Sequence, residues 1–358
     1  MKIGITGGGT LGHILPALSV YSELPPETEV FWIGRNDKVE RKIVEDKNIT
    51  FYSVCSGKFR RYFSLKNFFD LFRIIISFFQ SRKILRNERP SVLFSKGGFV
   101  SVPVAFAAFS LKIPVITHES DTTVGLATKL IAKRASLICT AYESAAEVLS
   151  RINQSLIVTG NPVRKDLFAG DGKRWREANK ISPEKKLVLV LGGSQGALKI
   201  NEAIRRDFPT IKDKCHLILQ AGKGKMDPDY HCDNYQEVEF FTSDYADVLN
   251  ASDIVVSRSG AGAISDLLSL KKPMILVPLG LEASRGDQIV NAQKLMESNR
   301  AIVVDDYSLI VENISALLQD SALASMLSKA IEKEKITDAG KTIASLIMKV
   351  GNNEFFSC

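Results

Sequence analysis

The sequence predicts an α/β protein made of two Rossmann-like, doubly wound domains that face each other across a cleft. The 358 residues suit two domains of about 150 to 200 residues each. Short apolar runs alternate with helix-length segments, which is typical of βαβ units and parallel sheets. Each half of the chain also contains a strand that runs directly into a glycine cluster, first at Gly7 and again at Gly192.

The first half contains six apolar runs that predict buried parallel strands. These runs cover residues 2–6, 29–34, 91–95, 114–119, 137–141 and 156–160. The turn-rich passage "GNPVRKDLF" begins at Gly160, where the series is interrupted. We therefore assign residues 1–160 to a first domain.

A second series of apolar runs follows and predicts another parallel sheet. Its strands are expected at residues 186–191, 215–222, 238–241, 254–257, 273–280 and 301–306. We assign residues 161–337 to this second domain. The remaining segment, 338–358, contains a helix from about Asp338 to Val350 that could pack back on the first domain.

The composition is that of a soluble globular protein, with 45% hydrophobic and 24% charged residues. The N-terminus lacks the basic and apolar regions of a signal peptide. No apolar run reaches the roughly 20 residues that a membrane span needs. The five cysteines are scattered and form no C-x-x-C motif, which argues against a disulfide framework and against a zinc site.

The first glycine cluster, "GGGTLGH", matches the spacing G-x-G-x-x-G at Gly7, Gly9 and Gly12. Such a loop can hold a phosphate, because the backbone approaches closely and the next helix begins with free N–H groups. A nicotinamide cofactor would also need an acid at the end of the second strand, and Asp37 comes late for that. A tight turn with no ligand is the remaining interpretation.

His13 follows this cluster at the start of the predicted helix. A helix N-terminus disfavours the cationic imidazole, so the neutral form is favoured there. That form suits a general base, or a donor to a phosphate or sugar oxygen. The alternative is a histidine that caps its own loop.

Two further strand ends in the first domain carry polar or glycine residues. "THESD" places His118 and Glu119 at the carboxyl end of a strand, where ligands bind in open α/β sheets. "SKGGF" places Gly97 and Gly98 at another. Surface polarity would also explain the His–Glu pair.

The second domain repeats the arrangement. "GGSQGA" follows its first strand and is another candidate phosphate loop. Asp266 lies one turn inside a later helix and could accept hydrogen bonds from a ribose. The loop "PLGLEASRGDQIVNAQKL" offers polar side chains at a strand end: Glu282, Arg285, Asp287, Gln288 and Asn291.

Seven motifs in order resemble the MurG family, the lipid II-forming N-acetylglucosaminyltransferases, which have the GT-B fold. The motifs are "GGGTLGH", "SKGGFVSVP", "HESD", "GNPVR", "GGSQGA", "RSGAGAISD" and "DQIVNA". The resemblance implies inverting transfer of GlcNAc from UDP-GlcNAc to the 4-hydroxyl of MurNAc in undecaprenyl-linked lipid I, with roles in peptidoglycan synthesis, cell shape and cell division. It implies no required cofactor and no metal, and it leaves the effect of divalent cations open.

The resemblance also implies roles for particular residues. His13 would be the catalytic base, with Glu119, directly or through His118, as the second candidate. The donor would be bound by Arg164, Gly193, Ser194, Gln195, Arg258, Ala261, Asp266, Gln288, Asn291 and Asp121. The acceptor would be bound by Thr10, Leu11, Gly12, Gly97, Gly98 and Phe99.

Several of these positions depart from the family pattern. Leu11 replaces a common glycine, Phe99 a frequent tyrosine, and the motif "HESD" stands where "HEQN" is usual, so that Asp121 replaces an amide. Asp266 replaces glutamate and is one methylene shorter, which affects its reach to both ribose hydroxyls. Asp287 stands where histidine or glutamine is common.

The segment from Lys58 to Arg86 has eight basic residues, one acid and seven phenylalanines. Asp70, Arg73, Ser77 and Gln80 form one polar stripe of a predicted helix whose remaining surface is apolar. Core packing is one interpretation. The basic flanks favour an anionic membrane, giving a peripheral enzyme at the cytoplasmic face of the plasma membrane. The membrane residues would be Phe68, Phe69, Phe72, Arg73, Phe79, Arg82 and Lys83.

Nucleic acid is not expected as a partner, because these phenylalanines lie on a helix and not on an alternating sheet surface. Three other functions stay open from the sequence. They are a GT-B transferase acting on another lipid such as diacylglycerol, a nicotinamide oxidoreductase, and a non-catalytic protein of the membrane surface.

Overall fold

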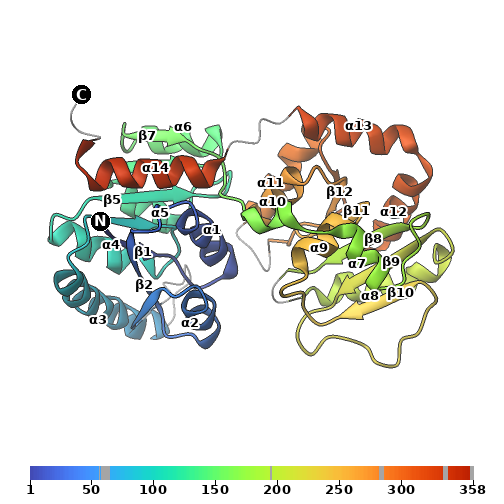
Figure 1. Cartoon of the computed structure of the whole chain (residues 1–358), viewed down its shortest axis with the longest axis horizontal. Coiled ribbons are helices and arrows are strands. Elements are labelled where there is room, and N and C mark those ends of the chain that lie inside the picture. The colour runs from blue at the N-terminus through green and yellow to red at the C-terminus, as the bar shows by residue number, and fades with distance from the viewer. Residues whose placement is uncertain (56, 58–64, 194–195, 282–285, 334–337, 355–358) are drawn as a thin grey trace. The chain divides into compact units, whose positions relative to one another are not determined.

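The computed structural model covers the whole chain and describes residues 1–55, 57, 65–193, 196–281, 286–333 and 338–354, with only the backbone at 65–71. The chain divides into two compact units (Figure 1). The first comprises Met1–Val163 with Thr337–Cys358, and the second comprises Arg164–Ile336. Each unit contains one parallel sheet with helices, which confirms the predicted fold class of two Rossmann-like domains.

The first unit has a seven-stranded parallel sheet in the order β3-β2-β1-β4-β5-β6-β7. The strands are β1 (Lys2–Thr6), β2 (Glu29–Arg35), β3 (Thr50–Val54), β4 (Val92–Ser95), β5 (Val115–Glu119), β6 (Leu137–Thr140) and β7 (Leu156–Val158). All six predicted strands are present. The sequence does not predict β3, because this edge strand alternates between buried and exposed side chains and lacks a continuous apolar run.

Helices cover both faces of this sheet. They are α1 (Leu11–Tyr21), α2 (Lys38–Glu45), α3 (Leu65–Glu88), α4 (Ser101–Ser110), α5 (Leu126–Ala132), α6 (Glu143–Ser150) and α14 (Ala339–Gly351). One apolar cluster joins α1, α2 and α14 to the strands, and a second joins α3, α4 and α5 to them. The central strands are therefore buried on both sides, which explains their unbroken apolar sequences.

Helix α14 comes from the end of the chain but belongs to the first unit. It packs against α1 (Figure 1). Ile343 and Ile347 are fully buried in the same apolar cluster as Ile14 and Ala17. The chain therefore returns from the second unit to complete one face of the first sheet.

The second unit has a six-stranded parallel sheet in the order β10-β9-β8-β11-β12-β13. The strands are β8 (Lys186–Leu191), β9 (Cys215–Gln220), β10 (Tyr235–Val238), β11 (Ile254–Ser257), β12 (Met274–Leu276) and β13 (Ile302–Val303). The predicted strand at 238–241 is wrong, because β10 pairs with β9 three residues earlier. This register packs Tyr235 against Phe208, whereas Phe240 is exposed.

The α-helices of the second unit are α7 (Gly172–Ala178), α8 (Leu198–Asp207), α9 (Tyr245–Ala251), α10 (Ala261–Ser269), α11 (Asp287–Glu297), α12 (Ile310–Gln319) and α13 (Ser321–Glu332). Three short 3-10 helices complete the described elements: Lys165–Ala169, Phe208–Thr210 and Tyr307–Leu309. Most of this unit's buried core lies between its sheet and helices α8, α12 and α13.

Strand order reverses once in each sheet, between β1 and β4 and between β8 and β11. Ligands of open α/β sheets bind outside the carboxyl ends of strands at such a reversal. The glycine clusters after β1 and β4, and the one after β8, occupy these two places. The topology thus places a candidate site in each unit.

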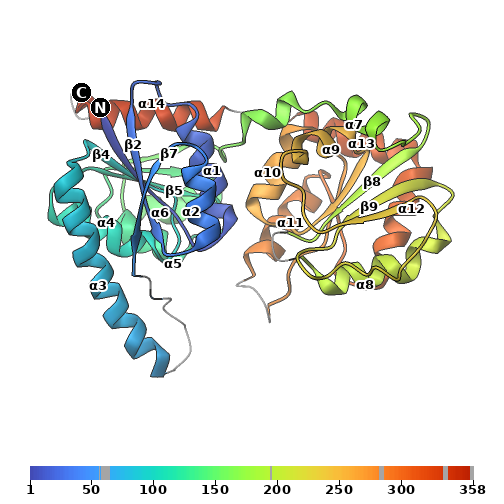
Figure 2. The same cartoon turned by 60° about the horizontal axis from the view of Figure 1, so that its bottom comes forward.

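Helix α3 packs on α4 and leaves part of its apolar surface exposed. Of the predicted polar stripe, Arg73 and Gln80 are exposed, whereas Ser77 is fully buried. Four apolar side chains face outward, and we call them the α3 apolar face: Phe72, Ile75, Ile76 and Phe79, between 47% and 63% exposed. The side chains of Phe68 and Phe69 lie outside the described residues. Figure 2 shows α3 extending beyond the sheet of its unit.

Candidate active site

In the first unit, the loops after β1 and β4 touch each other at the point where strand order reverses. A methyl group on Gly98 would lie 2.7 Å from the Gly8 carbonyl oxygen and 2.9 Å from Cδ2 of His13. A methyl group on Gly9 would lie 2.7 Å from the Phe99 ring. Gly9 and Gly98 also have φ angles of 94° and 84°, which favour glycine. Glycine at these positions therefore allows the two loops to touch, and any larger residue would force them apart.

His13 lies in the first turn of α1, with its ring against Gly98. Its backbone N–H donates to the Thr10 carbonyl at 3.1 Å. Thr10 and Gly12 are exposed beside it, while Leu11 is half-buried. The structure thus brings His13 together with the glycines of both predicted acceptor loops.

Glu40 supports the first glycine loop, a role that no motif in the sequence predicts. Its buried carboxylate accepts hydrogen bonds from Trp32 Nε1 at 3.1 Å and from the backbone N–H groups of Gly9 and Arg35. Burial raises the pKa of this carboxyl above its usual range. A methyl group on Gly8 would lie 2.7 Å from one of its oxygens, so Gly8 leaves room for the carboxylate.

Asp37, the acid that a nicotinamide cofactor would require, has a different role. One of its oxygens accepts from the N–H groups of Val39 and Glu40 and caps α2. The other accepts from Arg35 at 2.7 Å. These bonds hold the pKa of Asp37 below its usual range and commit the carboxylate to local structure. The loop after β2 therefore gives no support to dinucleotide binding.

Glu119 and His118 end β5 and organise the chain around them. The Glu119 carboxylate accepts from the backbone N–H groups of Ser120, Asp121 and Gly125 at 3.0–3.2 Å. His118 donates from Nε2 to the Gly160 carbonyl at 2.9 Å. Burial, together with the nearby Lys96 ammonium, holds the pKa of His118 well below its usual range, so its ring is neutral. The Nε2 bond joins β5 to the end of the domain, while Nδ1 of His118 has no partner and the Glu119 oxygens bind backbone N–H groups, so no hydrogen bond joins Glu119 to His118 in the described structure.

The remaining predicted residues of this unit lie along the same edge. Gly97, with a φ of 85°, begins the loop after β4 and lies near Thr128 of α5. Phe99 follows it, half-buried. Asp121 lies in the loop that Glu119 holds. The predicted acceptor residues and the candidate base therefore lie in the loops after β1 and β4 and in the first turn of α1, and Asp121, which the sequence assigned to the donor, lies in the neighbouring loop after β5.

In the second unit, three residues from separate segments form one cluster. The Arg164 guanidinium lies over the Tyr245 ring, 5.0 Å from its centroid. The Tyr245 hydroxyl donates to Asp266 at 3.5 Å. Burial raises the pKa of the Asp266 carboxyl to about 7, although Arg164 opposes this. The sequence predicts Arg164 and Asp266 as donor residues but not Tyr245, which joins them.

Arg258 anchors the loop that follows β12. Its guanidinium donates to the carbonyl oxygens of Val277 and Pro278, each at 3.1 Å, and lies over the Tyr307 ring. Ala261 begins α10 three residues later and is buried. Arg258 therefore holds the loop after β12 by its backbone carbonyls, and these contacts already engage the guanidinium.

Gln288 and Asn291 also connect loops of the second unit. The Gln288 side-chain oxygen accepts from the Leu279 N–H at 3.1 Å, and its backbone carbonyl accepts from the Ser259 hydroxyl at 2.8 Å. Asn291 donates to the Ser259 carbonyl at 3.2 Å. The loop after β11 and the start of α11 are thereby fastened together. Asp287 is the first residue of α11.

Gly193 lies in the turn between β8 and α8 with a φ of 80°. A methyl group there would meet nothing within 4 Å, so backbone conformation and not space explains this glycine. Ser194, Gln195, Glu282 and Arg285 lie outside the described residues.

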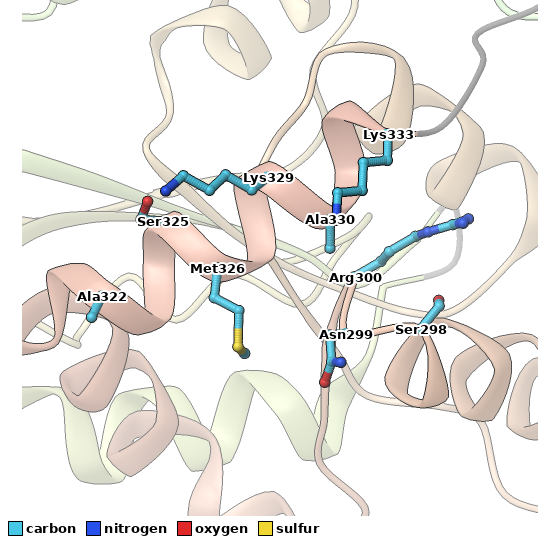
Figure 3. Close-up of a pocket in the computed structure, with 9 residues that line it drawn as sticks. All are labelled: Ser298, Asn299, Arg300, Ala322, Ser325, Met326, Lys329, Ala330 and Lys333. Carbon is cyan, nitrogen blue, oxygen red and sulfur yellow. The ribbon is translucent and has the colours of Figure 1, made fainter.

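A separate hollow of about 610 Å³ lies between the segment that follows α11 and one side of α13, from Ala322 to Lys333. Arg300, Lys329 and Lys333 line it, together with Met326 and small residues. Figure 3 shows Arg300 and Lys329 pointing in opposite directions, so these cations do not converge on one anion. None of the predicted donor residues lines this hollow. In the described part of the chain, no three His, Cys, Asp or Glu side chains are grouped to hold a metal ion.

Comparisons with known proteins match both units. Residues 3–140 match the glycosyltransferase family 28 N-terminal domain, and residues 187–346 match its C-terminal domain. A UDP-N-acetylglucosamine--N-acetylmuramyl-(pentapeptide) pyrophosphoryl-undecaprenol N-acetylglucosamine transferase of Clostridium botulinum is 37% identical over 354 residues, or 97% of this chain and 99% of the relative. The transferase of that name from Lachnospira eligens is 39% identical, over 89% of this chain and 90% of the relative.

Solved structures share the fold. The crystal structure of Acinetobacter baumannii MurG aligns with a TM-score of 0.71 at 21% identity, over 97% of this chain and 99% of that one. S. aureus MnaA, solved with UDP, aligns with the same TM-score at 16% identity, over 98% and 97%. At these levels of sequence identity, the two structures support only the assignment of the fold.

We expect Gly98→Ala to lower the free energy of unfolding by about 1–3 kcal/mol, because the methyl group meets Gly8 and His13 at a φ of 84°. Gly262→Ala is the matched control, since a methyl group there meets nothing within 4 Å. It lies inside α10 and should stabilise by about 0.4–1 kcal/mol. Urea unfolding measures both changes. A Gly98→Ala protein as stable as the wild type would contradict the close contact of the two loops.

Proposed function

The chain belongs to glycosyltransferase family 28 and, within it, to the MurG family, and from this membership we propose that it transfers GlcNAc from UDP-GlcNAc to lipid I. The acceptor is the 4-hydroxyl of MurNAc in undecaprenyl-pyrophosphoryl-MurNAc-pentapeptide, and the product is lipid II of peptidoglycan biosynthesis. The observation that carries this function is the 37% identity over 97% of the chain. It includes both the glycine loops and the Asp266 segment.

The first unit supplies the groups that an inverting transfer requires on the acceptor side. The attacking hydroxyl must lose a proton, and His13 is the proposed base. Its place at the start of α1 favours the neutral imidazole that can accept this proton. Glu119 remains the second candidate, but its carboxylate would first have to release backbone N–H groups that it already binds.

The glycine loops around His13 suit the pyrophosphate of the acceptor. In the loop after β1, Gly9 and Thr10 are exposed, and α1 begins directly after this loop. A helix N-terminus and nearby N–H groups favour an anion. The acceptor sugar would then lie beside the His13 ring, which packs on Gly98 of the second loop.

The second unit supplies the groups for the donor. The turn after β8 leads into α8, whose N-terminal dipole can stabilise the diphosphate of departing UDP. Asp266, held by Tyr245, would bind the ribose hydroxyls. Such a device stabilises the leaving group without a metal, so we propose that no cofactor is required.

We further propose that the protein binds the cytoplasmic face of the plasma membrane peripherally through the α3 apolar face. No described helix, α3 included, is long and apolar enough to cross a membrane. The outward Phe72 and Phe79 are each more than half exposed, and the basic Arg73 and Lys83 lie on the same helix. Phe106 of the neighbouring α4 is also exposed. Insertion of one Phe contributes roughly 1.5–3 kcal/mol and each nearby basic residue about 1 kcal/mol, which suits reversible binding.

The direct test uses purified protein with radiolabelled UDP-GlcNAc and a short-chain lipid I analogue, followed by counting of label in the lipid product. We expect a labelled disaccharide lipid, and a decrease in kcat of about 100- to 10,000-fold for His13→Ala through loss of the general base. His231→Ala, an exposed histidine between β9 and β10, is the control and should keep full activity. Transfer to diacylglycerol but not to the lipid I analogue would favour the alternative acceptor and contradict this function.

Donor affinity should depend on pH through Asp266. Its carboxyl has a pKa raised to about 7, so the ribose-binding carboxylate is present above this pH and is lost as the pH falls. Kd for UDP-GlcNAc, whose diphosphate diester keeps its charge over this range, should therefore rise about 10-fold from pH 8 to pH 6, following the fraction of carboxylate. Calorimetric titration measures this change. Asp266→Asn should bind weakly with no such step, and an unchanged step in this variant would rule out the assignment.

The double substitution of Phe72 and Phe79 by serine should weaken binding to anionic phosphatidylglycerol vesicles by at least about 100-fold, because two apolar insertions are removed. Vesicle co-sedimentation measures it. Phe168→Ser is the matched control, since Phe168 is 56% exposed in the second unit. Equal sedimentation of the double variant and the control would count against the α3 apolar face as the membrane contact.

A further inference from the structure

Lys96 is a buried cation at the edge of the sheet where the acceptor loops meet. It follows β4 directly and is only 1% exposed, although lysine is almost never fully buried without a partner. The motif "SKGGFVSVP" contains this residue, but none of the roles assigned above uses it. A buried ammonium is unfavourable for folding, so its presence at this edge requires an explanation.

The side chain of Lys96 contacts the loops that follow three neighbouring strands. A methyl group on Gly7, after β1, would lie 2.9 Å from Cβ of Lys96. The Lys96 backbone N–H donates to the Thr6 carbonyl at 2.8 Å. Its Nζ donates to the hydroxyl of Ser120, in the loop after β5. Lys96 thus bonds to the end of β1 through its backbone and to the loop after β5 through its ammonium.

The charges around Lys96 come from β5 and the loop that follows it. Glu119 and Asp121 are the acids that face the ammonium, and both favour its charged form. His118 is the other titratable neighbour, and it is neutral. On the β1 side, Lys96 meets only Gly7 and the Thr6 backbone, while His13 and Glu40 flank the next residues of that loop. Glu119 also accepts three backbone N–H groups, so the same carboxylate faces the ammonium and holds the loop after β5.

We propose that Lys96 is a positioning residue of the acceptor site, whose buried ammonium fixes the three loops and holds a positive charge beneath the pyrophosphate of the acceptor. This inference rests on the proposed function, since it takes these loops as the acceptor site. A cation below the loops favours a doubly charged pyrophosphate diester more than it favours a neutral sugar. The effect is strong because the site is buried and poorly screened.

The proposal has a consequence for pH. Burial lowers the pKa of Lys96 to about 8, against the pull of the two acids. Lys96 is therefore charged at pH 7 and neutral at pH 9, whereas the pyrophosphate diester keeps its charge over this range. Acceptor affinity should decrease as the pH rises through about 8.

Lys272 provides a matched control in the second unit. It is also largely buried, and burial lowers its pKa to about 8. Its ammonium donates to the carbonyls of Asn250 and Ser252, which precede β11 and so lie at the amino ends of the strands. That edge is opposite to the glycine turn after β8. Lys272 therefore titrates in the same pH range as Lys96, but it does not lie at the carboxyl edge of its sheet, where ligands bind.

The experiment is calorimetric titration of the full-length protein with the short-chain lipid I analogue at pH 7 and pH 9, without donor. The wild type should bind up to about 10-fold more weakly at pH 9, following the charged fraction of Lys96. Lys96→Met should bind at least about 10-fold more weakly at pH 7 and show no change at pH 9, with Kd for UDP unchanged. Lys272→Met should keep the wild-type affinity and its pH step, whatever its effect on thermal stability.

Ser120→Ala is a second variant for the case that Lys96→Met does not fold. Loss of the Ser120 hydroxyl should shift the midpoint of the pH step downward, because the charged form of Lys96 loses its hydrogen-bond acceptor. A wild-type pH step in Lys96→Met, or an unshifted midpoint in Ser120→Ala, would overturn the inference. Failure of the wild type to bind the analogue at any pH would instead count against the proposed acceptor itself.

Discussion

The close approach of two loops at the β1–β4 reversal is the constraint on which the acceptor side depends. Gly98 lies against the Gly8 carbonyl and the His13 ring, at distances that exclude a Cβ atom. Gly9 lies equally close to Phe99. Because these loops touch, the candidate base is fixed beside the backbone that would receive a pyrophosphate. The close packing of these glycines therefore helps to determine the position of the His13 ring.

Polar residues around both sites act mainly on the protein itself. Glu119 binds three N–H groups of its own loop, and Glu40 binds the first glycine loop from below. Arg258 and Gln288 hold the loop after β12 in the second unit. Such bonds fix the ligand-facing backbone before the substrate arrives, which reduces the cost of ordering it during binding and reaction. Substitution of these residues would therefore act through loop geometry.

The two units use one topology for different chemistry. Each sheet reverses strand order once, and a glycine turn leads into a helix at each reversal. In the first unit, His13 and the buried Lys96 lie beside the turn. In the second unit, Asp266 has a raised pKa and accepts a hydrogen bond from the Tyr245 hydroxyl. In the proposed function, the repeated turn would bind a phosphate in each unit, and the added side chains would distinguish the acceptor from the donor.

The sequence by itself determined the central strands, the glycine turns and the place of His13 and Asp266, because buried parallel strands and tight turns leave local patterns in neighbouring residues. It did not determine the edge strand β3 or the register of β10, whose side chains are only partly buried. Tertiary structure alone decided the roles of Glu40, Lys96 and Tyr245. Each of these side chains is defined by partners on other strands or helices, and no local period records such contacts. The outward face of α3 was decided in the same way, by its packing on α4.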